Sequence, residues 1–172
     1  MAAEVFFSVC YGDKHPPLAI QNLHTFTAAI LEDYCRHRVR FADYPAAVPE
    51  KGHNIRGIRI TGLTDANLEK LDYFEGSEYE RRKVKVRLLE KDGDTEVVGD
   101  EMSASVYVFL KAEALEKREW DFDEFRREKM NSWTRGDWSY GMRHQAFPLR
   151  LGKVTDSDGE DENDKAAIHC AV

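Results

Sequence analysis

Residues 54–89, NIRGIRITGLTDANLEKLDYFEGSEYERRKVKVRLL, decide the fold because they contain two alternating segments with a helical segment between them. In the first segment Ile58 and Ile60 recur with the two-residue period of a strand. Gly57, just before them, marks a bulge or a point of close backbone approach. The first segment therefore predicts a strand.

The last segment alternates more regularly. Apolar side chains face one way (Val84, Val86, Leu88) and basic side chains face the other (Lys83, Lys85, Arg87). This pattern predicts a strand that is half-buried on one side, and its basic stripe is explained as the solvated face. After the turn at 90–94, the sequence ASVYVFLK at 104–111 predicts another strand.

A helix is predicted between the first two strands. Thr64 is its N-cap and Gly76 its stop signal, with Asp65 in the first turn. A second helix is predicted after Trp120, where residues 121–124 form a capping box. Several strands with interspersed helices, without a regular βαβ rhythm, predict an α+β domain on a mixed or antiparallel sheet.

Glu75 is the most informative residue of the first helix. On a helical wheel it falls within the apolar stripe of Leu68 and Leu71, and Asp72 lies on the margin of that stripe. It also lies at the helix C-terminus, where the macrodipole disfavours an anion. Two hypotheses explain it. A structural ion pair would use Arg38, Arg40, Arg81 or Arg82, whereas a general acid/base would use the neutral-leaning pKa that desolvation gives a carboxyl.

Length and composition predict one intracellular domain. The chain has 172 residues, 42% of them hydrophobic, and no apolar run approaches the ~20 residues that span a bilayer. The three cysteines are widely spaced without a CxxC motif, which predicts free thiols and no zinc site. We expect a cytoplasmic protein with a domain at 1–153 and an acidic, disordered tail at 154–172.

Charge argues against nucleic-acid binding. From position 155 onward the chain carries six acidic residues against one lysine, so most of the net charge of −7 lies in the tail. The rest of the chain is nearly neutral and offers no electrostatic basis for binding nucleic acid. The basic run at 80–87 is accounted for by strand alternation.

Several stretches resemble the gamma-glutamylcyclotransferase family, and within it the avirulence-induced-gene-like branch of plants and fungi. They are LEDYCRHRVRFADYPAAVP (31–49), IRGIRITGLTDANLEKLDYFEGSEYERRKVKV (55–86), SVYVF (105–109) and EWDFDEFRREK (119–129). The resemblance spans roughly positions 31–133, and its most specific element is LDYFEGSEYERR. It implies a small β-barrel-like mixed sheet with flanking helices.

The resemblance also implies a reaction. The α-amine of a γ-glutamyl compound attacks its own γ-carbonyl, giving 5-oxoproline and a free amine or amino acid. The family's acid/base is the Glu before the Gly of the FEG element, which is Glu75 here. Tyr107 resembles a tyrosine that lines the family's substrate pocket, and Tyr79 is a further candidate. No metal or other cofactor is implied, and the partner is a small γ-glutamyl molecule rather than nucleic acid or membrane.

The opening MAAEVFFSVCYGD admits two interpretations. The family has an N-terminal strand that ends in a Tyr-Gly-Thr/Ser-Leu-like loop, which holds the γ-glutamyl group. Tyr11 and Gly12 would be its only local match, but Asp13 replaces the hydroxyl residue and would repel the substrate carboxylate. Val5, Phe6 and Val9 instead have helical spacing, with Gly12 as a cap.

We therefore expect a helix at the N-terminus and a chain that lacks the preceding strand and signature loop. Two functional hypotheses follow from this. The chain is a gamma-glutamylcyclotransferase that uses Glu75, or it is a non-catalytic binding domain of the same fold because the cradle is absent. A sheet edge left exposed by the missing strand would favour a homo-oligomer.

Overall fold

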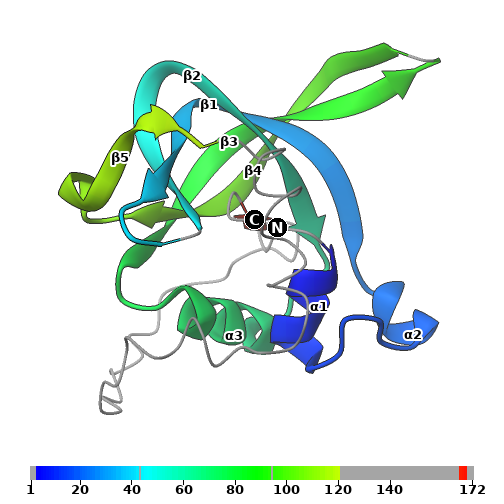
Figure 1. Ribbon diagram of the computed structural model, residues 1–172. Helices are drawn as coiled ribbons and strands as arrows, with labels where there is room; N and C mark the ends of the chain where they lie inside the picture. Colours follow the sequence, from blue (N-terminus) through cyan, green and yellow to red (C-terminus); the bar gives the residue numbers. More distant parts are fainter. Residues whose placement is uncertain (1–2, 43, 94, 121–166, 170–172) are drawn as a thin grey trace. The chain divides into compact units, whose positions relative to one another are not determined.

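The computed structural model describes residues 3–42, 44–93, 95–120 and 167–169. Four long strands form a closed ring, in which β1 pairs with β2, β2 with β4, β4 with β3, and β3 with β1 (Figure 1). These strands are β1 (Thr25–Val39), β2 (Pro45–Thr61), β3 (Tyr79–Asp92) and β4 (Thr95–Phe109). The β2–β4 pairing is parallel and the other three are antiparallel. The predicted α+β class with a mixed, barrel-like sheet is confirmed.

Short elements complete the sheet. Strand β5 (Leu115–Glu119) follows the 3-10 turn η1 (Ala112–Ala114) and pairs antiparallel with the end of β1. Strand β6 (Ala167–His169) lies between β2 and β4, antiparallel to the first and parallel to the second. The distal part of the β3–β4 hairpin projects beyond the barrel (Figure 1).

Strand β6 corrects one sequence prediction. The chain from 154 onward was expected to be a disordered tail, but residues 167–169 pair with β2 and β4. The acidic run ends at position 164, and the apolar pair that starts β6 is compatible with strand pairing. Backbone groups of β2 and β4 gain partners there, which a sheet edge otherwise lacks. The remaining tail residues and the helix predicted after Trp120 lie outside the described residues.

The alternation predicted for β3 is confirmed by the core. Val86 is 1% exposed, and Val84 and Leu88 pack against the same cluster. The fully buried members of this cluster come from all four barrel strands: Ala29, Leu31, Ala47, Ile55, Val86, Ala104, Val106 and Val108. Burial of each Val, Leu or Ile side chain in this cluster contributes roughly 1.5–3 kcal/mol, so the barrel interior contributes substantially to stability.

The N-terminal segment is a helix, as its spacing predicts. Helix α1 (Ala3–Tyr11) ends where the Gly12 amide donates to the Ser8 carbonyl at 3.0 Å, with Gly12 at φ +74°. A short helix α2 (Leu18–Gln21) follows. Phe6, 0% exposed, packs in one cluster with Leu71 of helix α3 (Asp65–Glu75) and Ile60 of β2. Helices α1 and α3 thereby lie at one end of the barrel (Figure 1).

Helix α3 begins with the predicted N-cap. The Thr64 side chain accepts a hydrogen bond from the Asn67 amide at 3.2 Å, and the Asn67 side chain accepts one from the Thr64 amide at 3.0 Å. This reciprocal capping box satisfies two backbone donors that the helix itself leaves unpaired. It fixes where α3 starts, and therefore where its last residue, Glu75, is placed. None of the helices in the described part is long and apolar enough to cross a membrane.

Gly62, between β2 and α3, should not tolerate a side chain. It has φ +76°, and a Cβ built there would lie 2.0 Å from the Leu23 carbonyl oxygen. Gly12 has nearly the same φ, +74°, with nothing within 4 Å. We expect Gly12→Ala to lower the free energy of unfolding by about 1 kcal/mol, because alanine is disfavoured in the left-handed conformation. Gly62→Ala should lower it clearly more, because its Cβ would also clash with the backbone. Urea unfolding of both variants measures the difference, and equal losses would mean that the backbone contact at Gly62 is unimportant.

Candidate active site around Glu75

Glu75 is the last residue of α3, and the chain turns immediately after it at Gly76, with φ +73°. Its Oε1 atom is enclosed, although the residue as a whole is only half-buried. Burial raises the pKa of the Glu75 carboxyl from 4.5 to about 8. A carboxyl with this pKa exists in both protonation states near neutral pH, which suits proton transfer.

The charge of Glu75 acts on three phenols. Burial first, and then the charge of Glu75, raises the pKa of Tyr79. Glu75 contributes in the same direction to the raised pKa values of Tyr107 and Tyr44, in both of which burial is the larger cause. Tyr107 is 6% exposed, and the Tyr79 ring packs edge-on against Phe109 at 5.1 Å. The two tyrosines singled out from the sequence, Tyr79 and Tyr107, thus both lie near Glu75.

Asp72 positions one of these phenols. The Tyr107 hydroxyl donates to Asp72 Oδ1 at 2.5 Å, and Arg81 Nε lies 3.4 Å from the same oxygen. This chain of contacts joins α3, β3 and β4 on the side of Glu75. It also fixes the Tyr107 ring, because an oriented phenol loses rotational freedom when its hydroxyl is bound to a charged acceptor.

The arginines considered as ion-pair partners of Glu75 make other contacts. Arg81 pairs with Asp72, and Arg82 lies 2.6 Å from Glu80. Arg40 donates to the Leu115 carbonyl at 3.1 Å, and Arg38 donates to the Ala42 carbonyl at 2.9 Å. Each of these contacts is directed to a group other than the Glu75 carboxyl.

Sequence reasoning missed Tyr44 as a neighbour of the site, and it missed the contact between Arg81 and Asp72. Tyr44 directly precedes β2, in the YPAAVP stretch that carried the family resemblance, and that stretch was the available signal. Arg81 was considered only as a partner of Glu75. The described side-chain groups that could together hold a metal ion include none of the residues around Glu75.

The raised pKa predicts how stability depends on pH. Between pH 4.5 and about 8 the unfolded chain has lost the Glu75 proton, whereas the folded chain keeps it. The folded state therefore binds more protons, and its stability from this group falls as pH rises, by at most ~1.4 kcal/mol per pH unit. We expect Glu75→Gln to have a flatter stability profile between pH 5 and 8, measured by urea unfolding. Parallel profiles for the two proteins would contradict the raised pKa.

Comparisons with known proteins show which family the chain resembles. The model of the family described as gamma-glutamyl cyclotransferase, AIG2-like, matches residues 10–139. AIG2-like protein D of Arabidopsis thaliana is 31% identical over 111 residues, which cover 64% of this chain and 69% of the relative. Protein AIG2 B of the same plant is 34% identical over 129 residues and 70% of each chain.

A solution structure from Arabidopsis thaliana covers 90% of this chain and 92% of its own, with 23% identity and a TM-score of 0.46. The family match includes the whole stretch from α3 to β4 that builds the site around Glu75. The motif resemblance is confirmed: the chain belongs to the AIG2-like gamma-glutamyl cyclotransferase family.

Proposed function

We propose that this protein is a gamma-glutamylcyclotransferase that releases 5-oxoproline from γ-glutamyl compounds. The observation that carries the proposal is the enclosed Glu75 carboxyl, with a pKa of about 8, beside Tyr79 and Tyr107. Family membership supports cyclotransferase-type chemistry, and the site supplies the one group that such chemistry needs most, which is a carboxyl able to accept and to return a proton.

The proposed reaction balances without a co-reactant. The α-amine nitrogen forms a bond to the γ-carbonyl carbon, and the bond from that carbon to the departing nitrogen breaks. Ionised Glu75 accepts a proton from the attacking amine, and the resulting acid donates it to the departing nitrogen. The carboxyl ends in its starting state, and the products are 5-oxoproline and a free amine or amino acid.

The tyrosines have positioning roles in this proposal. Tyr107, held by Asp72, and Tyr79 would line the substrate position beside Glu75. Both phenols stay protonated at neutral pH, because burial raises their pKa values. The single O–H of Tyr107 is already donated to Asp72, so Tyr79 is the phenol that would donate to the oxygen on which negative charge develops. Removing one donor of this kind typically costs about 10²–10³-fold in turnover.

The test is release of 5-oxoproline from a panel of γ-glutamyl amino acids, γ-glutamyl peptides and γ-glutamylamines. The proposal expects at least one compound to give 5-oxoproline and free amine in equal amounts. These compounds share the reacting half, so the panel varies only the departing amine. If no compound of the panel is turned over by folded protein, the catalytic proposal is wrong.

A non-catalytic binding domain is the second candidate, and one observation favours it. Tyr11 and Gly12 end helix α1 rather than leading a strand into a loop, so described residues 3–12 do not form the family's substrate cradle. On this alternative the protein would bind a γ-glutamyl compound near Glu75 without turning it over. Calorimetric binding of a γ-glutamyl compound, with no 5-oxoproline released, would identify it.

A further inference from the structure

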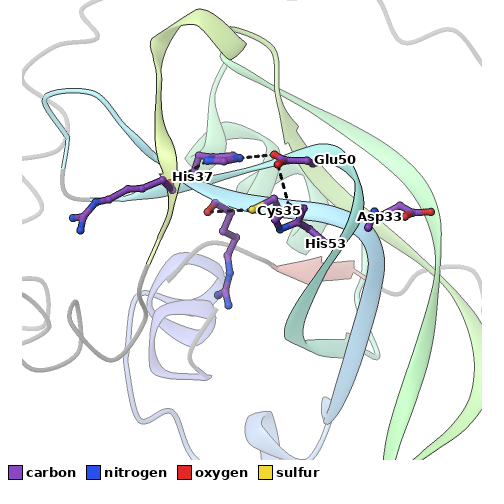
Figure 2. Close-up of polar contacts among 8 residues, drawn as sticks. Asp33, Cys35, His37, Glu50 and His53 are labelled. Atoms are coloured by element: carbon purple, nitrogen blue, oxygen red, sulfur yellow. Dashed lines mark hydrogen bonds and ion pairs between the residues drawn. The ribbon is translucent and has the colours of Figure 1, made fainter.

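A second cluster of reactive side chains lies where β1 and β2 lose their regular pairing, and it shares no residue with the site around Glu75. Cys35 and His37 are two residues apart on β1, so their side chains lie on one face of the strand. Strand β2 places Glu50 and His53 against them (Figure 2). The sequence gives no metal motif here, because the four side chains come from two strands.

An irregular backbone brings these side chains together. Between the pairs Glu32↔Asn54 and Tyr34↔Pro49, β1 has one residue and β2 has four, residues 50–53. The single β1 residue, Asp33, has φ +58°, and its Oδ1 accepts a hydrogen bond from the Gly52 amide at 2.9 Å. A non-glycine residue in this conformation is strained, and such strain often marks a functional position.

The donor atoms are already close to one another. His37 Nε2 lies 2.6 Å from Glu50 Oε2, and His53 Nε2 lies 3.3 Å from Glu50 Oε1. The Cys35 sulfur, the His37 ring and the Glu50 carboxylate present ligand atoms that are all within 4.8 Å of one another. Ligands of a tetrahedral Zn²⁺ at 2.0–2.3 Å are about 3.3–3.8 Å apart, so small side-chain rotations would bring these three ligands to that spacing. His53, which contacts Glu50, would be the fourth ligand.

The outer contacts of His37 orient it as a ligand. Its Nδ1 lies 3.0 Å from the Arg118 carbonyl oxygen, which can only accept, so Nδ1 carries a proton. The Nε2 atom lies 2.6 Å from Glu50 Oε2. A cation bound between these two atoms would replace the hydrogen bond that joins them. A backbone carbonyl on the far nitrogen is the usual support of a metal-bound histidine.

Two arginines lie near the cluster and also contact groups outside it. The Arg36 guanidinium lies over the Trp120 ring at 5.6 Å, and Arg118 Nε lies 3.5 Å from Glu116. A further carboxylate is available, because Glu119 of β5 groups with Cys35 and His53 within the same 4.8 Å limit. Two carboxylates, from Glu50 and Glu119, therefore lie within reach of the Cys35 thiol.

We propose that Cys35, His37, Glu50 and His53 bind a divalent transition-metal cation such as Zn²⁺. The bound cation would cross-link β2 to β1 at the bulge. Two imidazoles, a thiol and a carboxylate are the donor set that Zn²⁺ and Co²⁺ accept in tetrahedral geometry. Binding displaces the thiol proton and the proton between His37 and Glu50, so the cation replaces hydrogen bonds with direct bonds. All four protein ligands fill the coordination sphere, which is typical of a structural site.

The test is titration of the tag-free, chelator-treated full chain with Zn²⁺ by calorimetry and with Co²⁺ by absorption spectroscopy. We expect one equivalent to bind, a cobalt–thiolate charge-transfer band, and a melting temperature that rises with Zn²⁺ and falls again with chelator. His53→Gln and Glu50→Gln change partly exposed side chains, at 46% and 39% exposure, and should weaken binding by ~10-fold or more.

Two further variants complete the design. Cys35→Ser should abolish the charge-transfer band. If this variant does not fold, the Zn²⁺ affinities of His53→Gln and Glu50→Gln test the proposal instead. His15→Gln is the matched control, because His15 is an exposed histidine in the loop between α1 and α2 and should leave Zn²⁺ affinity unchanged. Absence of Zn²⁺ binding by the folded protein, or equal affinity in His53→Gln, Glu50→Gln and the control, would overturn the proposal.

Discussion

Replacing Glu75 with Gln should lower the turnover of γ-glutamyl compounds by at least ~10²-fold, the usual contribution of a positioned acid/base. The substitution keeps the size of the side chain and removes the titrating proton, so the fold at the end of α3 should be retained. The measurement is kcat for 5-oxoproline release on a substrate that the wild-type protein turns over, together with the circular dichroism spectrum of the variant.

Asp72→Asn is the matched control. Asp72 lies one turn before Glu75 on the same helix, and its side chain is 45% exposed. Asn keeps an oxygen that can accept from the Tyr107 hydroxyl but loses the charge that attracts Arg81. We expect a loss of about 1 kcal/mol in stability and a smaller effect on turnover than that of Glu75→Gln. Retained activity in Glu75→Gln, or equal losses in both variants, would remove the assigned role.

Phe6→Ala should give the largest loss of stability, about 3–5 kcal/mol, because it leaves a large cavity in a packed cluster. Phe6 is 0% exposed, and its ring lies 4.8 Å from that of His24, 5.3 Å from that of Phe7 and 5.7 Å from that of Phe26. The free energy of unfolding in urea measures the loss.

Phe41→Ala is the control for Phe6→Ala, since it makes the same chemical change at a fully exposed side chain. It should alter the free energy of unfolding by no more than about 0.5 kcal/mol. Similar losses in both variants would show that helix α1 is not packed into the domain. That result would also remove the physical basis for placing α1 beside α3.

The sequence predicted the parts of the fold that have regular patterns. Strand β3 alternates along the part that enters the barrel, and α3 has both a cap and a stop signal, so their positions were predicted closely. Strand β1 was not predicted, because its apolar residues at 28–31 form a continuous run rather than an alternation. Strand β6 was not predicted, because three residues are too few to show the two-residue alternation of a strand.

The sequence predicted the central residue of the candidate site, Glu75, but not all of the residues around it. Glu75 stands out because a carboxyl in an apolar stripe at a helix C-terminus is unfavourable in isolation, and local spacing reveals this. Tyr44 and Arg81 reach the site through strand pairing, which no local pattern encodes. The Cys35 cluster depends on register between two strands and on a bulge, so sequence spacing predicted free thiols without a metal site.

The most direct test of the central claim is a carbon-13 NMR titration of the Glu75 carboxyl, assigned by the signal that disappears in Glu75→Gln. A carboxyl that both accepts and donates a proton near neutral pH must titrate there. The account predicts a pKa of about 8, set by burial at the end of α3. A carboxyl that titrates near its ordinary value of 4.5 would be ionised throughout the neutral range, and that result would contradict the account.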